Sequence, residues 1–103
     1  MKNLSIFEVL VEPNRRRILD LLRVRDRTVG EIAEHFSLSQ PAISKHLRVL
    51  REAGLVEVHK HAQQHRYHLR AEPLAEVDHW LEPYRQFWSE KLDALEQYLD
   101  EEE

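Results

Sequence analysis

The chain has 103 residues and a formal net charge of −4. Its residues are 42% hydrophobic and 33% charged, which predicts one folded domain over residues 1–103 and excludes a disordered chain. Cysteine is absent, which excludes disulfides, thiolate metal sites and thiol redox switches. No apolar stretch approaches the roughly 20 residues that a bilayer span needs and no signal-peptide pattern opens the chain, so we expect a cytoplasmic protein with no membrane partner.

Two short helices are predicted first. Residues 5–8, Ser-Ile-Phe-Glu, have the spacing of a capping box and open a helix that should end near Pro13. A second helix is expected from about residue 14 to residue 23. Its arginines at positions 15–17 point in three directions around a helix, so we interpret them as a solvated face with an ion pair inside the molecule. Its buried stripe is Ile18, Leu19, Leu21 and Leu22.

A helix-turn-helix is predicted over residues 28–54. Residues 28–31, Thr-Val-Gly-Glu, are a second capping box, and Phe36 is expected on the inner face of the helix that it opens. After a turn at residues 37–39, Ser39 caps the next helix, whose end is set by Gly54. The outer face of this helix has the small polar and basic residues that a helix needs in the major groove of DNA: Gln40, Ser44, Lys45, Arg48 and Arg51.

The hydrophobic period changes to two between residues 55 and 70, which predicts a β-hairpin with its turn near residues 61–62. One face of this hairpin should carry Val56, Val58, His65, Tyr67 and Leu69. The other face should carry Glu57, His59, His61, Arg66 and His68.

A long last helix is predicted from about residue 74 to residue 99, with a kink or restart at Pro83. Its apolar stripe is wider than so small a core can cover, and a two-fold dimer is the simplest way to bury it. A ligand pocket between these aromatic helices is the alternative. The residues of this helix that we expect in the dimer interface are Leu81, Tyr84, Phe87, Trp88, Leu92, Leu95 and Leu99.

Positive charge gathers in the middle of the chain. Residues 1–39 hold seven Lys/Arg and six Asp/Glu, residues 40–70 hold six and two, and residues 71–103 hold two and eleven. The basic middle stretch coincides with the predicted DNA-binding elements, which supplies the electrostatic footprint for phosphate. The acidic last third should stay away from DNA.

This order of elements is that of a mostly α (α+β) winged helix with a two-stranded wing, and the residues themselves resemble the ArsR/SmtB family of bacterial transcriptional repressors. The specific match is residues 38–56, Leu-Ser-Gln-Pro-Ala-Ile-Ser-Lys-His-Leu-Arg-Val-Leu-Arg-Glu-Ala-Gly-Leu-Val, together with residues 13–22, Pro-Asn-Arg-Arg-Arg-Ile-Leu-Asp-Leu-Leu. Residues 80–99 are similar to a subgroup without the metal sites, so that the resemblance covers nearly the whole chain. It implies a homodimer on an inverted-repeat operator, with the first helix also in the interface, which adds Leu4 and Phe7.

Among the candidate DNA contacts, Gln40 ranks first for base recognition because its amide can pair with the N6 and N7 atoms of adenine. Ser44, Lys45 and His46 follow four to six positions later and can reach base edges or phosphates, and Ser39 can touch a phosphate beside its capping role. The residues expected to hold the phosphate backbone without distinguishing sequence are Arg48, Arg51, Lys60 and Arg66.

Neither metal site that the resemblance implies matches this sequence. The first needs cysteines between residues 31 and 36, where there are none. The second needs Asp-x-His in the last helix, but Asp78 is followed directly by His79, and Lys91 stands at the later ligand position. We therefore expect no metal and no cofactor.

The predicted wing keeps one alternative open, because three of its histidines share a face and imidazole suits zinc, nickel or copper: His59, His61 and His68. The wing also departs from the resemblance at its turn, where Ala62 stands in place of the usual Gly. An L-residue is costly at positive φ, which predicts another turn type or a longer turn.

The leading hypothesis is a metal-independent, homodimeric DNA-binding repressor. The resemblance implies that such repressors often regulate their own operon. One alternative is a metal-responsive repressor with an atypical His/acid site. Another is a winged-helix protein-interaction module without DNA binding. An enzyme has the least support, because no nucleophile is paired with a base and only Gly30 and Gly54 are available for a phosphate-binding loop.

Overall fold

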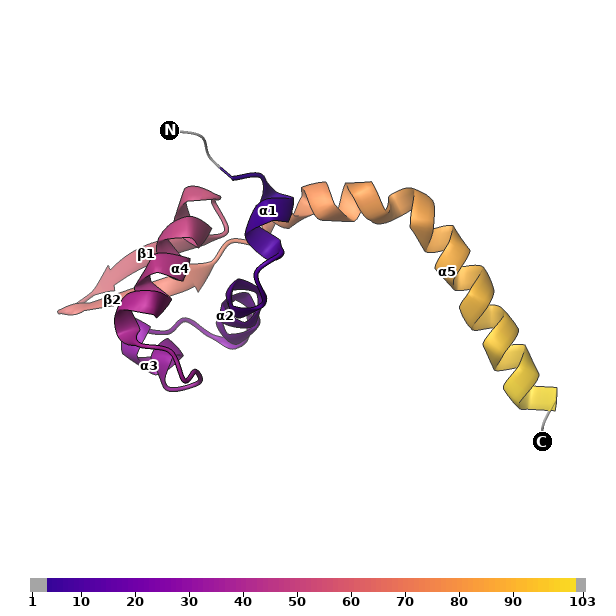
Figure 1. Ribbon diagram of the computed structural model, residues 1–103, viewed down its shortest axis with the longest axis horizontal. Helices are drawn as coiled ribbons and strands as arrows, with labels where there is room; N and C mark the ends of the chain where they lie inside the picture. Colours follow the sequence, from indigo (N-terminus) through magenta and orange to yellow (C-terminus); the bar gives the residue numbers. More distant parts are fainter. Residues whose placement is uncertain (1–3, 102–103) are drawn as a thin grey trace.

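The computed structural model describes residues 4–101. Four helices are followed by a hairpin and a long last helix, so the predicted mostly α fold with a two-stranded wing is confirmed (Figure 1). The elements are α1 (Ile6–Leu10), α2 (Pro13–Val24), α3 (Val29–Ala33), α4 (Gln40–Glu52), β1 (Val56–His61), β2 (Gln64–Leu69), the 3-10 turn η1 (Glu72–Leu74) and α5 (Ala75–Glu101).

Side-chain caps start the first four helices. Both predicted capping boxes are present, one between Ser5 and Glu8 and one between Thr28 and Glu31. The hydroxyl of Ser39 accepts a 3.3 Å hydrogen bond from the backbone of Ala42, as expected for the N-cap of α4. The start of α2 differs from the prediction, because a glutamate, Glu12, caps it and Pro13 is its first residue.

The core is built from eleven buried aliphatic side chains of α1 to α4 and the start of the wing. In α4, Ile43, Leu47 and Leu50 are all buried, so the opposite face of that helix must lie in solvent. The complete set is Ile6, Val9, Ile18, Leu19, Leu22, Ile32, Ile43, Leu47, Leu50, Leu55 and Val56.

Two local predictions need correction. The third helix ends at Ala33 and does not reach Phe36, because the chain turns there through two tight backbone hydrogen bonds. The arginine run of α2 makes no ion pair within residues 4–101. Instead, Arg16 donates to the Leu10 carbonyl at the end of α1 (2.6 Å), and the Arg17 guanidinium lies over the Phe36 ring (4.6 Å to its centroid).

The wing is a tight antiparallel hairpin whose pairing runs from Val56↔Leu69 to His61↔Gln64, which confirms the two predicted faces. The prediction for the turn is wrong. The pairing of His61 with Gln64 leaves a loop of two residues, and Ala62 adopts a positive φ of 56° within it.

A third, short partner lies beside β2 and was not predicted. The backbone N–H of Arg27 donates to the Tyr67 carbonyl (3.2 Å), and the Tyr67 N–H donates to the Arg27 carbonyl (2.7 Å). The side chain of Arg27 is buried, and its Nε donates to the Leu21 carbonyl near the end of α2 (3.1 Å). Residue 27 therefore joins the wing to the helical core.

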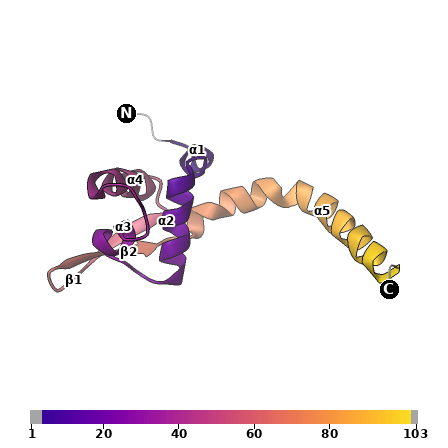
Figure 2. The same cartoon turned by 60° about the horizontal axis from the view of Figure 1, so that its bottom comes forward.

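Helix α5 leaves the core on the side opposite the wing (Figures 1 and 2). It contains no buried residue, and the radius of gyration is 18.1 Å, whereas a compact domain of this length has about 13 Å. The helix continues through Pro83 and bends along its length (Figure 1), as expected where a proline removes a backbone hydrogen bond. Within residues 4–101, none of the helices has the length and apolar character required to cross a membrane.

The two glycines predict opposite effects on stability. Gly54 has a φ of +78°, so Gly54→Ala should lower the free energy of unfolding by about 1–2 kcal/mol. Gly30 lies inside α3, where a Cβ would meet neighbours at no less than 3.7 Å, so Gly30→Ala should raise it by about 0.5–1 kcal/mol. Urea unfolding of the two variants measures both changes, and equal signs would contradict the backbone assignment.

Candidate nucleic-acid interface

The exposed face of α4 carries the five polar and basic residues expected from the sequence. Each of them lies in solvent because the buried aliphatic residues occupy the other side of the helix. These residues are Gln40, Ser44, Lys45, Arg48 and Arg51.

Gln40 lies where α3 and α4 meet. Its Nε2 is 3.7 Å from the position that a Cβ on Gly30 would take, so the glycine leaves room beside the amide. The neighbouring Ser39 uses its oxygen to cap α4, and its hydroxyl hydrogen remains able to donate to a phosphate. Both side chains are exposed.

His46 occupies a different flank of α4. It is half-buried and close enough to Glu12 of the α2 cap to affect that carboxylate. Burial raises the pKa of Glu12, but hydrogen bonds from the backbones of Arg15 and Asn14, with His46 nearby, lower the pKa below its ordinary value. The structure therefore places His46 toward α2, away from the flank that holds Gln40 and Ser44.

The two wing cations differ in their surroundings. Lys60 is exposed near the tip of β1. Arg66 is half-buried, with its Nη1 3.8 Å from the Glu31 carboxylate and its Nη2 donating to Gln64 (3.1 Å). A phosphate would have to compete with Glu31 for Arg66.

Four of the predicted cations are available for phosphate. Within residues 4–101, none of the ion pairs engages them, whereas Arg25, Arg66, Arg70 and Arg85 are all paired. Two of the four line a hollow of about 400 Å³ beside Glu52. The available cations are Lys45, Arg48, Arg51 and Lys60.

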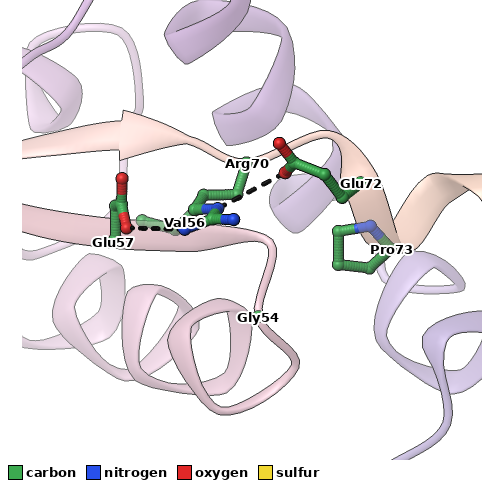
Figure 3. A pocket seen from close by; sticks show the side chains of 6 residues that line it. All are labelled: Gly54, Val56, Glu57, Arg70, Glu72 and Pro73. Atoms are coloured by element: carbon green, nitrogen blue, oxygen red, sulfur yellow. Dashed lines mark hydrogen bonds and ion pairs between the residues drawn. The ribbon is translucent and has the colours of Figure 1, made fainter.

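A second hollow, of about 330 Å³, lies between the start of β1 and η1 (Figure 3). Arg70 lines it and contacts Glu57 (3.1 Å) and Glu72 (3.3 Å). The hydrogen bonds from Arg70 lower the pKa of Glu57, and those carboxylates raise the pKa of Arg70. With one cation against two carboxylates, this hollow has a net negative charge and does not favour an anionic ligand such as phosphate.

Glu31 is the charged residue that connects α3 with its surroundings. Its carboxylate accepts from the Thr28 backbone (2.9 Å) and pairs with Arg25 (3.2 Å) as well as with Arg66. The hydrogen bond from the Thr28 backbone, followed by that from Arg25, lowers the pKa of Glu31 from 4.5 to about 2. The sequence identified Glu31 only as part of a capping box.

The structure also changes the group of possible metal ligands. In the described part of the chain, the group of three that could hold an ion is Asp26, His59 and His68, with the ligand atoms within 4.8 Å of one another. His61, which the sequence placed with the two histidines, is not in this group. Asp26 was missed because it lies far away in sequence, next to the backbone bridge at Arg27.

The predicted dimer surface is exposed along α5 and α1. Eight of its nine predicted residues are exposed, and Leu81 is half-buried. The Phe7 ring packs edge-on against Trp80 (centroids 5.8 Å apart), and Trp80 packs against Tyr84 (5.3 Å). Trp80 thus joins the α1 and α5 parts of one apolar surface. The eight exposed residues are Leu4, Phe7, Tyr84, Phe87, Trp88, Leu92, Leu95 and Leu99.

Comparison with known proteins gives consistent matches. Residues 12–58 match the family model described as bacterial regulatory protein, arsR family. The transcriptional repressor SdpR of Bacillus subtilis is 40% identical over 77 residues, which cover 75% of this chain and 86% of that protein. The arsenical resistance operon repressor of Staphylococcus xylosus is 38% identical over 68 residues, 66% of this chain and 65% of that repressor.

A crystal structure of a possible transcriptional regulator for arsenical resistance is also similar. Its TM-score is 0.70 at 42% sequence identity, and the match covers 89% of this chain and 93% of that chain. Because the match covers 89% of this chain, it extends well beyond the helix-turn-helix.

The lowered pKa of Glu31 predicts a specific acid sensitivity. Because the folded-state pKa is about 2 against an ordinary 4.5, the stabilisation by Glu31 is complete above about pH 4.5 and is lost as the pH falls toward 2. The unfolding temperature of the wild type should therefore fall more steeply between pH 4.5 and pH 2 than that of Glu31→Gln, as measured by thermal unfolding.

Glu34→Gln is the matched control, because the Glu34 side chain makes no hydrogen bond or ion pair within residues 4–101. This variant should follow the wild-type pH profile. Parallel profiles for the wild type and Glu31→Gln would show that the Glu31 contacts do not persist in solution.

Proposed function

Because the chain belongs to the ArsR family of bacterial regulatory proteins, we propose that it is a transcriptional repressor that binds an inverted-repeat operator as a homodimer without needing a metal. Its relatives are transcriptional regulators and not enzymes. It acts in the cytoplasm, and its own operon is a target.

The observation that carries the proposal is the exposed face of α4. A helix that buries its apolar side and presents an amide, a hydroxyl and unpaired cations fits the major groove, where side chains contact base edges. Gln40, Ser44 and Lys45 are the proposed base-contacting residues, and Ser39 contacts a phosphate. His46 lies next to α2, and in this proposal it supports the position of α4 and does not contact a base.

The wing and the end of α4 hold the phosphate backbone in this proposal. Arg48, Arg51 and Lys60 have no intramolecular ion partner to give up within residues 4–101. Arg66 must exchange its 3.8 Å contact with Glu31 for a phosphate. These contacts fix the position of the protein without distinguishing sequence.

The homodimer is supported by the apolar surface of α1 and α5. Helix α5 has 27 residues and no buried residue, and it exposes a continuous stripe of large apolar side chains of the kind that marks an interaction surface. Two copies related by a two-fold axis can bury the stripe against each other. The two α4 helices then contact half-sites about one helical turn apart.

Metal independence is supported by the residues at the two positions where the family resemblance would place metal ligands. Helix α3 and the turn after it contain no cysteine. At the start of α5, the Asp78 carboxylate is paired with Arg85, and His79 is adjacent to it rather than two positions on.

Substitutions on α4 should separate sequence recognition from phosphate binding. Gln40→Ala should cost about 1–3 kcal/mol of preference for the operator over unrelated DNA, with an unchanged salt dependence. Arg51→Ala should weaken binding to all DNA and reduce the slope of log K against log salt by about 1 per protomer. Fluorescence anisotropy at several salt concentrations, with upstream DNA and a scrambled duplex, measures both effects.

Gln86→Ala is the matched control on the exposed surface of α5 and should bind like the wild type. If the triple substitution of Gln40, Ser44 and Lys45 by Ala left operator binding intact, α4 would not be the recognition helix. That result would favour a protein-interaction module.

The dimer predicts that a charge in the middle of the apolar stripe separates the two copies. In size-exclusion chromatography with light scattering, Leu92→Glu should have the molar mass of a monomer. Its operator affinity should fall to that for a single half-site. Leu92 is exposed in one copy, so the substitution should not unfold the chain.

Gln97→Glu adds the same charge about 140° around the helix from Leu92 and should remain dimeric. A dimeric Leu92→Glu variant would contradict the assignment of α5 to the interface.

A further inference from the structure

A side-chain cluster on the outer face of the wing is not used by the proposed DNA contacts. Because Arg27 pairs antiparallel with Tyr67, residue 26 lies opposite residue 68 across the sheet. On its other side, His68 lies opposite Glu57 of β1. The backbone therefore places three ionisable side chains in one row on the solvent side of the sheet.

His59 completes this cluster from the next row of β1. Its ring is stacked on that of His68, with the centroids 5.0 Å apart and the planes inclined by 20°. Nδ1 of His68 lies 2.8 Å from the Asp26 carboxylate, and Nε2 of His59 lies 3.0 Å from the Glu57 carboxylate. A His–Asp hydrogen bond alone accounts for the position of His68, but it does not account for a second histidine stacked on the first.

The donor set suits a borderline transition metal. Two imidazoles and a carboxylate are ligands of Zn²⁺ and Ni²⁺, and three protein ligands leave a position for water. The three ligand atoms lie within 4.8 Å of one another, whereas a tetrahedral ion with bonds of about 2.0–2.2 Å needs them about 3.5 Å apart. The His59 and Glu57 side chains are 52% and 37% exposed, so small rotations of both can close a gap of at most about 1.3 Å while their contact is kept.

The surroundings of the cluster already orient its ligands. Glu57 contacts His59 through one carboxylate oxygen and Arg70 through the other (3.1 Å). A carboxylate that holds the second nitrogen of a metal-bound histidine fixes the orientation of the ring and raises its basicity as a ligand. Glu57 is thus a positioning residue, and Arg70 holds it in place.

We propose that Asp26, His59 and His68 form a binding site for a divalent transition metal, with Zn²⁺ as the representative ion. The site goes beyond the proposed function, in which DNA binding needs no metal. Its ligands come from β1, β2 and the connector between α2 and α3, so a bound ion adds a cross-link between the wing and the helix-turn-helix. The ion stabilises the attachment of the wing that carries Lys60.

Calorimetric titration of the full chain with ZnCl₂, after removal of metal with a chelator, tests the site in the absence of DNA. We expect one zinc ion per chain and a higher unfolding temperature of the zinc-bound protein. His59→Gln and Asp26→Asn should each weaken zinc binding by more than tenfold, and Glu57→Gln should weaken it by about tenfold. Neither ligand variant should show the zinc-dependent rise in unfolding temperature.

His61→Gln is the matched control, because it makes the same chemical change on the same face of the same strand, outside the cluster. It should bind zinc like the wild type. Failure of the wild type to bind zinc, or an equal loss of affinity in His61→Gln and His59→Gln, would overturn the site. Operator binding is to be measured separately in the presence of a chelator, so neither result bears on it.

Discussion

The position of the wing depends on one pair of backbone hydrogen bonds, those between Arg27 and Tyr67. They attach β2 to the connector that leads into α3, and the buried guanidinium of Arg27 holds the same connector to the end of α2. Because α3 and α4 pack into one core, this joint also sets the distance between the wing and the exposed face of α4. The Arg66–Glu31 and His68–Asp26 contacts form beside it and reinforce it.

The two proposed interaction surfaces of the chain, one for DNA and one for a second copy, differ in charge and in hydrophobicity. Helix α4 and the wing carry Lys45, Arg48, Arg51 and Lys60, which make no ion pair within residues 4–101, and α5 carries an apolar stripe with acidic residues. A helix with no buried residue in one copy needs a surface to pack on, whereas unpaired surface cations favour phosphate. The wing and α5 leave the core on opposite sides, so the proposed DNA-binding and dimer surfaces do not compete for the same part of the molecule (Figures 1 and 2).

Much of the fold could be predicted because its signals are local. The capping boxes at Ser5 and Thr28 involve residues three apart, and the faces of α4 and the hairpin follow from helical and strand periods. The two wrong predictions about the backbone also concern local structure, at the end of α3 and at the turn of the wing. The third helix ended early at Ala33, and Ala62 accepted a positive φ that a two-residue hairpin loop imposes.

The sequence by itself determined which residues α4 and the hairpin present on each face, because side-chain periodicity follows from backbone geometry within a few residues. Only the tertiary structure decided that Asp26 meets His68, 42 positions away, and that Glu31 meets Arg66. These contacts depend on a short edge pairing at Arg27, which has no periodic pattern to reveal it. The same distinction applies to His46, whose direction toward Glu12 follows from how α2 and α4 pack.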